Sequence, residues 1–188
     1  MDVHTQSFLN NHPCFNKGAS VNWGRGHLPV APNCNIQCNF CNRMYDCANE
    51  NRPGVTQKVY TPDEAVAYLE KLFKDRQDIS VIGIAGPGDP MCDADKTLPT
   101  FEKCRARFPH LMLCLSTNGL ALPEHVDDIV RIGVSHVTVT VNAVTPSVGG
   151  KVYAWVRYNG KTYTGEEGAA ILLARQDEGI RKLKEAGM

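Results

Sequence analysis

The chain has 188 residues, 43% of them hydrophobic, and its 20 basic residues balance its 20 acidic residues. This length suits a single domain with its own hydrophobic core. The balanced charge argues against a nucleic-acid or membrane surface, and no apolar run approaches the roughly 20 residues of a membrane span. Because residues 1–6 lack the basic and apolar regions of a secretory signal, we expect a cytoplasmic protein.

The beginning of the chain divides into a polar segment and the start of a core. Residues 1–26 are rich in Asn and Gly, and we expect them to form an irregular N-terminal segment. A core domain is expected at residues 27–188. The apolar run at residues 28–31 predicts a first strand, placed directly before a loop that is rich in cysteine.

The next predicted elements are a helix, a buried strand and a glycine turn. The helix starts near Thr61, because Thr61 can cap it, Pro62 suits its first position and Glu64 completes a capping box. The apolar run at residues 80–85 predicts a buried strand. It leads into the turn at residues 86–90, in which Gly86 and Gly88 allow a close backbone approach and expose N–H and C=O groups.

The remainder of the chain repeats the strand–helix pattern. It predicts a helix around residues 98–108, a strand at 111–117, a helix from Pro123 to Gly133, a strand at 137–142 and a last helix at about 166–186. In the last helix, Ala169, Leu173, Ile180 and Leu183 are expected to face inward. Four strand–helix units indicate an α/β fold with a parallel sheet. Because a closed eight-stranded barrel needs roughly 250 residues, we expect a partial (β/α) barrel that is incomplete at its C-terminal end.

Parallel α/β folds place their sites at the carboxyl ends of the strands. Along the predicted fourth strand, Thr138, Thr140 and Asn142 share a polar face that must look into a cavity. Along the third, Cys114 shares a face with Ser116 and Asn118, while the leucines between them are expected to meet the helices. We therefore expect Cys114 to point into the same cavity, although a lone strand cysteine is more often a small buried hydrophobe.

Three of the eight cysteines, Cys34, Cys38 and Cys41, form a C-x3-C-x2-C motif. In a chain without an export signal, such thiols favour metal binding over disulfides. Three ligands are one short of the four that closed zinc sites and ordinary iron–sulfur centres use. A cubane held by three thiolates leaves one iron open for chemistry. The alternative is a zinc or electron-transfer site whose fourth ligand lies elsewhere, with Cys47 as a candidate.

This spacing resembles the signature of the radical S-adenosylmethionine (SAM) superfamily, in which the amino and carboxylate groups of SAM chelate the open iron of a [4Fe-4S] cluster. Longer motifs resemble the radical SAM family of nitrogenase cofactor maturation, and this resemblance covers the chain from about His12 onward. The motifs are Leu28 to Pro32, Asn42 to Cys47, Asn49 to Val55, Gly83 to Pro90, Ser116 to Gly119 and Tyr153 to Tyr158.

The resemblance implies a specific reaction. That family fuses two [4Fe-4S] precursor clusters into an eight-iron, carbide-containing cluster. One SAM donates a methyl group to a cluster sulfide, a second SAM yields the 5′-deoxyadenosyl radical that abstracts hydrogen from that methyl, and an additional sulfur is supplied. Iron–sulfur cluster donors, a carrier or acceptor protein for the product and a reductant of the ferredoxin or flavodoxin type are the implied partners. Nucleic acid and membrane are not.

The family pattern also implies roles for individual residues. Cys34, Cys38 and Cys41 would hold the SAM-cleaving cluster, and His27, Cys47 and Cys114 one precursor cluster. Cys14 would bind the other precursor cluster, whose remaining ligands are paired cysteines near a C-terminal end that we expect this chain to lack. The expected SAM contacts are Phe40, Gly86, Gly88, Asp89, Asn118, Thr138, Thr140 and Asn142.

Several assignments have simpler alternatives. Phe40 fits loop packing as well as an adenine contact, and Cys104 is expected in the core. Cys92, Glu50 and Arg52 lie near the expected site without a pattern that assigns them a role. The whole chain would also fit another radical SAM enzyme that modifies a peptide or small molecule with auxiliary clusters, a non-catalytic iron–sulfur carrier, or a zinc-stabilised binding module.

Overall fold

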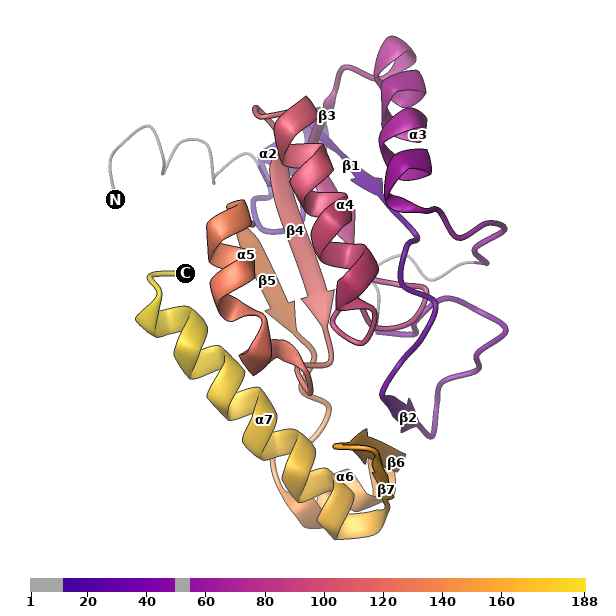
Figure 1. The fold of residues 1–188 in the computed structure, drawn as a ribbon, viewed down its shortest axis with the longest axis vertical. Coiled ribbons are helices and arrows are strands. Elements are labelled where there is room, and N and C mark those ends of the chain that lie inside the picture. Colours follow the sequence, from indigo (N-terminus) through magenta and orange to yellow (C-terminus); the bar gives the residue numbers. More distant parts are fainter. Residues whose placement is uncertain (1–11, 50–54) are drawn as a thin grey trace.

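The computed structural model describes residues 12–49 and 55–188 (Figure 1). A parallel four-stranded sheet in the order β1-β3-β4-β5 forms its centre. These strands are β1 (Gly24–His27), β3 (Ile79–Ile84), β4 (Met112–Thr117) and β5 (His136–Val139). The α/β prediction and the partial barrel are both confirmed by this parallel arrangement.

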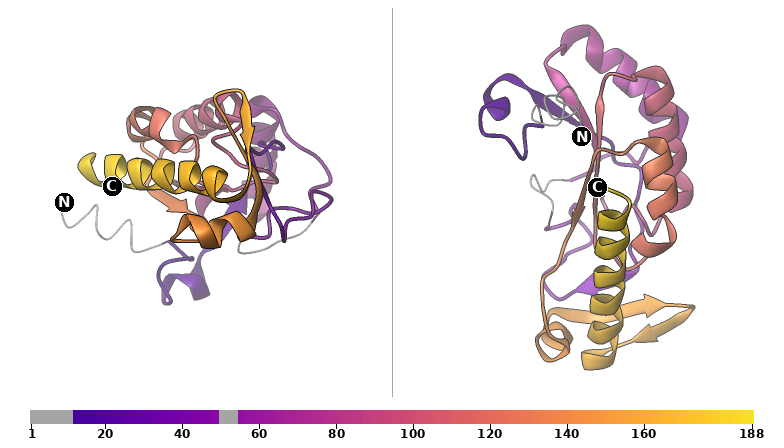
Figure 2. Two further views of the ribbon diagram at one scale, coloured as in Figure 1. Left: turned by 90° about the horizontal axis from the view of Figure 1, so that it is seen from below. Right: turned by 90° about the vertical axis from the view of Figure 1, so that its left-hand side faces the viewer.

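Three helices cover one face of this sheet: α3 (Pro62–Asp75), α4 (Ala94–Arg107) and α5 (Val126–Ile132). Figure 2 shows them together on one side of the strands, with the short helix α2 (Ala19–Asn22) on the other. The buried core between sheet and helices joins Leu113 and Leu115 of β4 to Leu69 of α3 and Phe101 of α4. The leucines of β4 therefore meet the helices, as their alternation predicts.

The first strand is not where the apolar run predicts it. β1 comprises Gly24–His27, and the short helix α2 (Ala19–Asn22) also lies in the segment expected to be irregular. Gly26 pairs with Ile82, and a Cβ at Gly26 would lie 3.1 Å from the Ile82 side chain. The glycine therefore allows a close approach to β3. Beyond His27, the apolar run keeps a bond from the Leu28 N–H to the Gly83 carbonyl and an isolated bridge between Ala31 and Pro87, but it forms no strand. Residues 1–11 of the predicted segment lie outside the described residues, so its domain boundary stays a prediction.

The helix ends follow the predicted local chemistry. The Thr61 side chain accepts a hydrogen bond from the Glu64 N–H, and the Glu64 carboxylate accepts one from the Thr61 N–H, which completes the capping box of α3. The predicted helix after Pro123 is divided into a 3-10 turn, Leu122–Glu124, and α5. α5 ends at Gly133, whose φ of 79° is left-handed and favours glycine.

The last predicted strand and helix need small corrections. β5 ends at Val139, opposite Thr117 at the end of β4, so Thr140 and Asn142 lie beyond the ladder. The helix α7 spans Gly165–Glu185. Its residue Ile180 is 45% exposed and not inward, whereas Gln176 and Gly179 are buried. The buried stripe is therefore rotated toward small and polar residues, because α7 packs closely against Leu122 at Gly179.

A second, antiparallel sheet lies beyond the carboxyl ends of β4 and β5 (Figure 1). It consists of β2 (Ile36–Cys38), β6 (Tyr153–Tyr158) and β7 (Lys161–Tyr163), and α6 (Pro146–Val152) precedes β6. The predicted elements include no strand between residues 142 and 166. The sequence does contain a signal for the β6–β7 hairpin. Asn159 and Gly160, both with positive φ, form a two-residue turn of the Asn-Gly type that is typical of hairpins.

Membrane insertion through a helix finds no support in the described part of the chain. None of the helices within residues 12–49 and 55–188 is both long enough and apolar enough to cross a bilayer.

Candidate functional site

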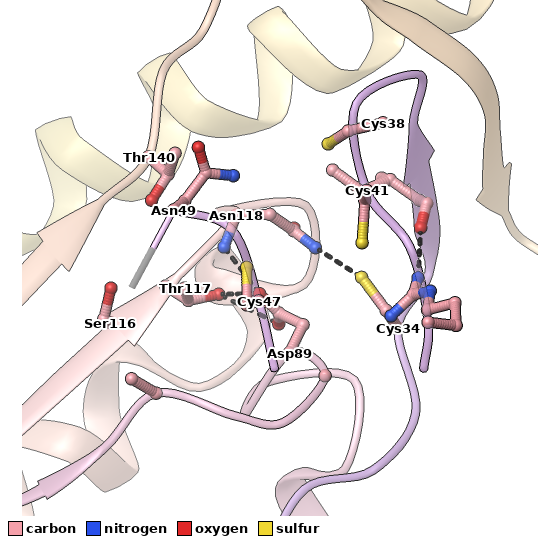
Figure 3. Close-up of a pocket in the computed structure, with 14 residues that line it drawn as sticks. Cys34, Cys38, Cys41, Cys47, Asn49, Asp89, Ser116, Thr117, Asn118 and Thr140 are labelled. Carbon is pink, nitrogen blue, oxygen red and sulfur yellow. Dashed lines mark hydrogen bonds between the residues drawn. The ribbon is translucent and has the colours of Figure 1, made fainter. Parts of the chain in front are cut away.

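A pocket lies between the cysteine loop and the carboxyl ends of the parallel strands (Figure 3). About 500 Å³ of space, part of it open to solvent, separates the two walls. The loop wall contains Cys34, Ile36, Cys38, Cys41, Arg43, Cys47 and Asn49, and the strand wall contains Ala85, Gly88, Asp89, Ser116, Thr117, Asn118 and Thr140. The prediction that the cysteine loop and the glycine turn meet at this edge is therefore confirmed.

Pairing with the small sheet shapes the cysteine loop. Gln37 of β2 lies opposite Trp155 of β6, and the Arg157 N–H donates to the Asn35 carbonyl at 2.8 Å. The Asn39 N–H donates to the Val152 carbonyl at 2.9 Å. These long-range backbone bonds bend the loop around the pocket, so that Cys34, Cys38 and Cys41 all contribute to its wall.

The three thiols have the chemistry of a soft metal-binding set. All are free cysteines, and burial, followed by the neighbouring Cys34, Cys47 and Cys41, raises the pKa of Cys38 to about 12. Thiolates crowded together in this way require a bound cation to compensate their charge, and sulfur ligands suit iron–sulfur clusters. The donor set therefore fits a [4Fe-4S] cluster.

The side-chain geometry is not yet that of a metal site. Within residues 12–49 and 55–188, no three His, Cys, Asp or Glu side chains are arranged to hold a metal ion. The structure brings Cys34, Cys38 and Cys41 to one pocket, and cluster binding by them stays a prediction.

A buried carboxylate, Asp89, organises the strand wall. Its oxygens accept hydrogen bonds from the Thr117 hydroxyl at 3.0 Å, the Asn118 N–H at 2.5 Å and the Met91 N–H at 3.0 Å. Burial raises the pKa of Asp89, while the hydrogen bonds from Asn118 and Thr117 act in the opposite direction. Asp89 therefore ties the glycine turn after β3 to the end of β4.

Asn118 connects this wall to the cysteine loop. Its side-chain amide donates to the Asn35 side chain at 2.7 Å. The same amide donates to the sulfur of Cys34 at 3.6 Å (Figure 3). Its carbonyl accepts a bond of 2.7 Å from Gln176 of α7, which also donates to the Thr140 carbonyl at 3.0 Å. Gln176 thus holds the ends of β4 and β5 together beneath the pocket.

The glycine turn contacts the start of the cysteine loop. A Cβ at Gly88 would lie 2.0 Å from the Asn33 carbonyl oxygen, so a side chain is excluded there. The Gly88 N–H donates to the Ala31 carbonyl and the Asp89 N–H to the Asn33 carbonyl, each at 2.6 Å. The expectation that the turn exposes its N–H groups is therefore wrong for these two, because the loop already uses them.

A second carboxylate, Asp93, binds the same point of the loop. It accepts bonds of 2.8 Å from the backbone N–H and from the side-chain amide of Asn33. Asn33 directly precedes Cys34, so Asp93 and Gly88 together determine the position of the first cysteine of the motif.

The predicted precursor-cluster ligands are only partly assembled. Cys47 lines the pocket, whereas Cys114 is buried beside Val81 and Met112 and is not among the described residues that line it. His27 is the last residue of β1. Burial and, to a smaller extent, Arg25 lower its pKa to about 4, while nearby Asp46 acts in the opposite direction. Cys14 is exposed in the N-terminal segment.

Several predicted SAM contacts also lie away from the described pocket wall: Phe40, Gly86, Thr138 and Asn142. Phe40 is 52% exposed, and the Asn142 N–H donates to the Tyr153 hydroxyl at 3.3 Å. Cys104 is fully buried in the main core, as expected. Glu50 and Arg52 lie outside the described residues.

Sequence reasoning missed several residues of the site. Arg43 and Asn49 follow the cysteine motif, Thr117 ends β4, and Gln176 reaches the pocket floor from α7. A polar residue on the inward stripe of a helix is the signal that could have revealed Gln176, because a buried amide needs partners.

A sequence profile of the radical SAM superfamily matches residues 28–188. The chain belongs to the radical SAM superfamily. It is 48% identical over 180 residues to the FeMo cofactor biosynthesis protein NifB of Chlorobaculum tepidum, which covers 96% of the chain and 42% of that protein. The NifB of Sinorhizobium fredii is 48% identical over 188 residues, and that of Bradyrhizobium diazoefficiens is 49% identical over 180.

This radical SAM chain spans only part of its relatives. It covers 42%, 38% and 36% of the length of these three NifB proteins. Membership of the superfamily implies a [4Fe-4S] cluster and SAM, and the thiol set on the loop wall fits that cluster.

Proposed function

We propose that this chain is the radical SAM core of an enzyme of nitrogenase cofactor biosynthesis. The observation that carries the proposal is the convergence of Cys34, Cys38 and Cys41 on one pocket at the carboxyl edge of a parallel sheet. The similarity to NifB proteins of three organisms, at 48–49% identity, supports the biosynthetic assignment.

Each wall of the pocket has a separate task in this proposal. Cys34, Cys38 and Cys41 hold the [4Fe-4S] cluster, which together with bound SAM supplies reductive cleavage to a 5′-deoxyadenosyl radical. The proposed SAM site lies along the strand wall, which Gly88, Asp89, Asn118 and Thr140 line. Phe40, Gly86, Thr138 and Asn142 are proposed as further SAM contacts outside this lining.

Asp89 acts in this proposal by placing its neighbours. Its carboxylate is occupied by Thr117, Asn118 and Met91, so it does not present a free charge to a ligand. The Asn118 side chain, which it orients, lies between Asn35 and the Cys34 sulfur. Asp89 therefore maintains the distance between the strand wall and the cluster-binding loop.

The substrates in this proposal are two [4Fe-4S] precursor clusters, which are fused into an eight-iron carbide-containing cluster. SAM supplies the methyl group that becomes the carbide and the radical that abstracts its hydrogen. His27, Cys47 and Cys114 are proposed to bind one precursor, and Cys14 the other. Cluster donors, a product carrier and a ferredoxin- or flavodoxin-like reductant are the proposed partners.

Anaerobic reconstitution with iron and sulfide tests the superfamily reaction. We expect about one cubane at Cys34, Cys38 and Cys41, and production of 5′-deoxyadenosine after addition of SAM and dithionite. Absence of 5′-deoxyadenosine would contradict the proposal for this chain and favour an iron–sulfur carrier. Zinc without iron or sulfide would instead indicate a binding module.

The precursor site has its own experiment. Replacing Cys47 and Cys114 together by Ala should lower the iron content by about one cubane and leave the SAM-cleaving cluster in place. An unchanged iron content would remove the precursor assignment and favour a radical SAM enzyme that acts on a peptide or small molecule.

A further inference from the structure

Two polar side chains hold the cysteine loop together from within. The Gln37 side-chain amide donates to the carbonyl of Cys38 at 3.0 Å and to the carbonyl of Cys41 at 2.9 Å. Arg43 donates from Nη2 to the Ile36 carbonyl at 2.7 Å and from Nε to the Gln37 side-chain oxygen at 3.2 Å. Arg43 therefore orients Gln37, and Gln37 orients the backbone between the second and third cysteines.

The same guanidinium is close to the thiols of the pocket. Arg43 lines the pocket with Cys34, Cys41 and Cys47. The positive charge of Arg43 therefore lies in the same pocket as these three thiols. Asp89 on the opposite wall is occupied by Thr117 and backbone N–H groups and does not compete for this cation.

We propose that Arg43 is the positioning residue of the cysteine loop: its guanidinium fork braces the loop through Ile36 and Gln37 and holds a positive charge near the sulfur of Cys34. The effect of this charge on a cluster at Cys34 rests on the function proposed above. The brace itself concerns only contacts of this chain.

The fork geometry matters for the choice of arginine. A guanidinium presents several N–H groups in one plane, so one side chain can reach a carbonyl and an amide oxygen together. Lysine retains the charge but concentrates its donors at one atom. Hydrogen bonds and positive charge at cluster sulfurs stabilise the reduced, more negative form of a cluster and raise its reduction potential.

Hydrogen exchange on the metal-free chain tests the brace. We compare the wild type with Arg43→Gln and Arg43→Lys, and with Arg131→Gln as a matched control. Arg131 lies on α5 and pairs with Glu102 and Asp128, away from the pocket. The reporter is the Cys41 N–H, which donates to the Cys38 carbonyl at 3.0 Å. Loss of one hydrogen bond corresponds to exchange about tenfold faster in both Arg43 variants, and the control should match the wild type.

A redox titration of the reconstituted chain tests whether the Arg43 charge alters the midpoint potential of a cluster at Cys34. Dithionite adds one electron to the cluster, and electron paramagnetic resonance follows its reduced form. The midpoint potential of Arg43→Gln should be more negative than that of the wild type. Arg43→Lys should recover part of this shift without recovering protection at Cys41.

Each outcome decides one way. Unchanged exchange at Cys41, or an unchanged midpoint potential in Arg43→Gln, overturns the proposal, as does full recovery of both by Lys. A wild-type chain that takes up no cluster contradicts the proposed function instead, and the exchange measurement on the metal-free chain then decides on the brace alone.

Discussion

The two sheets of the molecule differ in the size of their apolar cores and in their connection to the site. The parallel sheet is covered by α3, α4 and α5, and its core consists of large apolar side chains such as Ile82, Leu113 and Phe101 (Figure 1). The small sheet that contains β2 has a smaller apolar core, in which Ile36 of β2 and Val156 of β6 pack with Leu172 of α7. The cysteine loop beside it is further held by hydrogen bonds from its own polar side chains. Apolar burial therefore stabilises both sheets, and directional hydrogen bonds add the shape of the site.

This difference predicts that substitutions in the two regions affect different properties. Changes in the core of the parallel sheet should lower the free energy of unfolding. Changes at the contact between the glycine turn and the cysteine loop should remove metal binding while the helix content stays the same. Four variants test this separation, beginning with the largest expected effect.

Gly88→Ala should abolish cluster uptake. Its Cβ would lie 2.0 Å from the Asn33 carbonyl oxygen, so the start of the cysteine loop must move. Iron and sulfide are measured after anaerobic reconstitution, and circular dichroism reports the helices. Gly18→Ala is the control, because a Cβ there lies 3.3 Å from the Asn16 side chain in an exposed turn. Normal iron content in Gly88→Ala would show that the loop tolerates the displacement.

Leu113→Ala should destabilise the whole chain. Leu113 is fully buried between β4 and the helices, and removing such a side chain from a core costs about 2–5 kcal/mol. Urea unfolding measures the change in the metal-free chain. Val144→Ala, at a residue that is 84% exposed, should change stability by less than about 0.5 kcal/mol. Equal effects of the two variants would contradict the assigned core.

Thr117→Val should have an intermediate effect on stability. The substitution removes the hydroxyl that donates to both oxygens of Asp89 at 3.0 Å and preserves the shape of the side chain. Hydrogen bonds to a charged group contribute about 1.5–3 kcal/mol, which urea unfolding measures. Thr162→Val, at an exposed position of β7, serves as the control. If the free energy of unfolding falls no more than in the control, the remaining hydrogen-bond donors suffice for Asp89.

Gly160→Ala should have the smallest effect, confined to the hairpin. Gly160 has a φ of 74°, and a non-glycine residue in the left-handed region costs about 1–2 kcal/mol. Hydrogen exchange should quicken at the β6–β7 amides, while the amides of β3 and β4 keep their protection. Asn159→Gly, at the neighbouring position with a φ of 48°, should leave exchange nearly unchanged. Faster exchange in β3 would show that the two sheets unfold together.

Local sequence chemistry predicted much of the parallel half of the fold. The capping box at Thr61, the strand alternation around Leu113 and the helix end at Gly133 depend on neighbouring residues, and all three were confirmed. The predictions failed where long-range pairing decides. β1 lies at Gly24–His27, where Gly26 fits against Ile82, and an apolar run next to it does not reveal that contact.

The site shows the same division. By itself, the sequence determined that three closely spaced thiols and a glycine turn occur at the ends of strands, because both depend on spacing along the chain. Only the tertiary structure decided that Asp93 binds Asn33, that Gln176 joins the ends of β4 and β5, and that Cys114 packs against Val81 and Met112. Such contacts join residues far apart in the chain, and they form only where packing brings specific donors and acceptors within hydrogen-bonding distance.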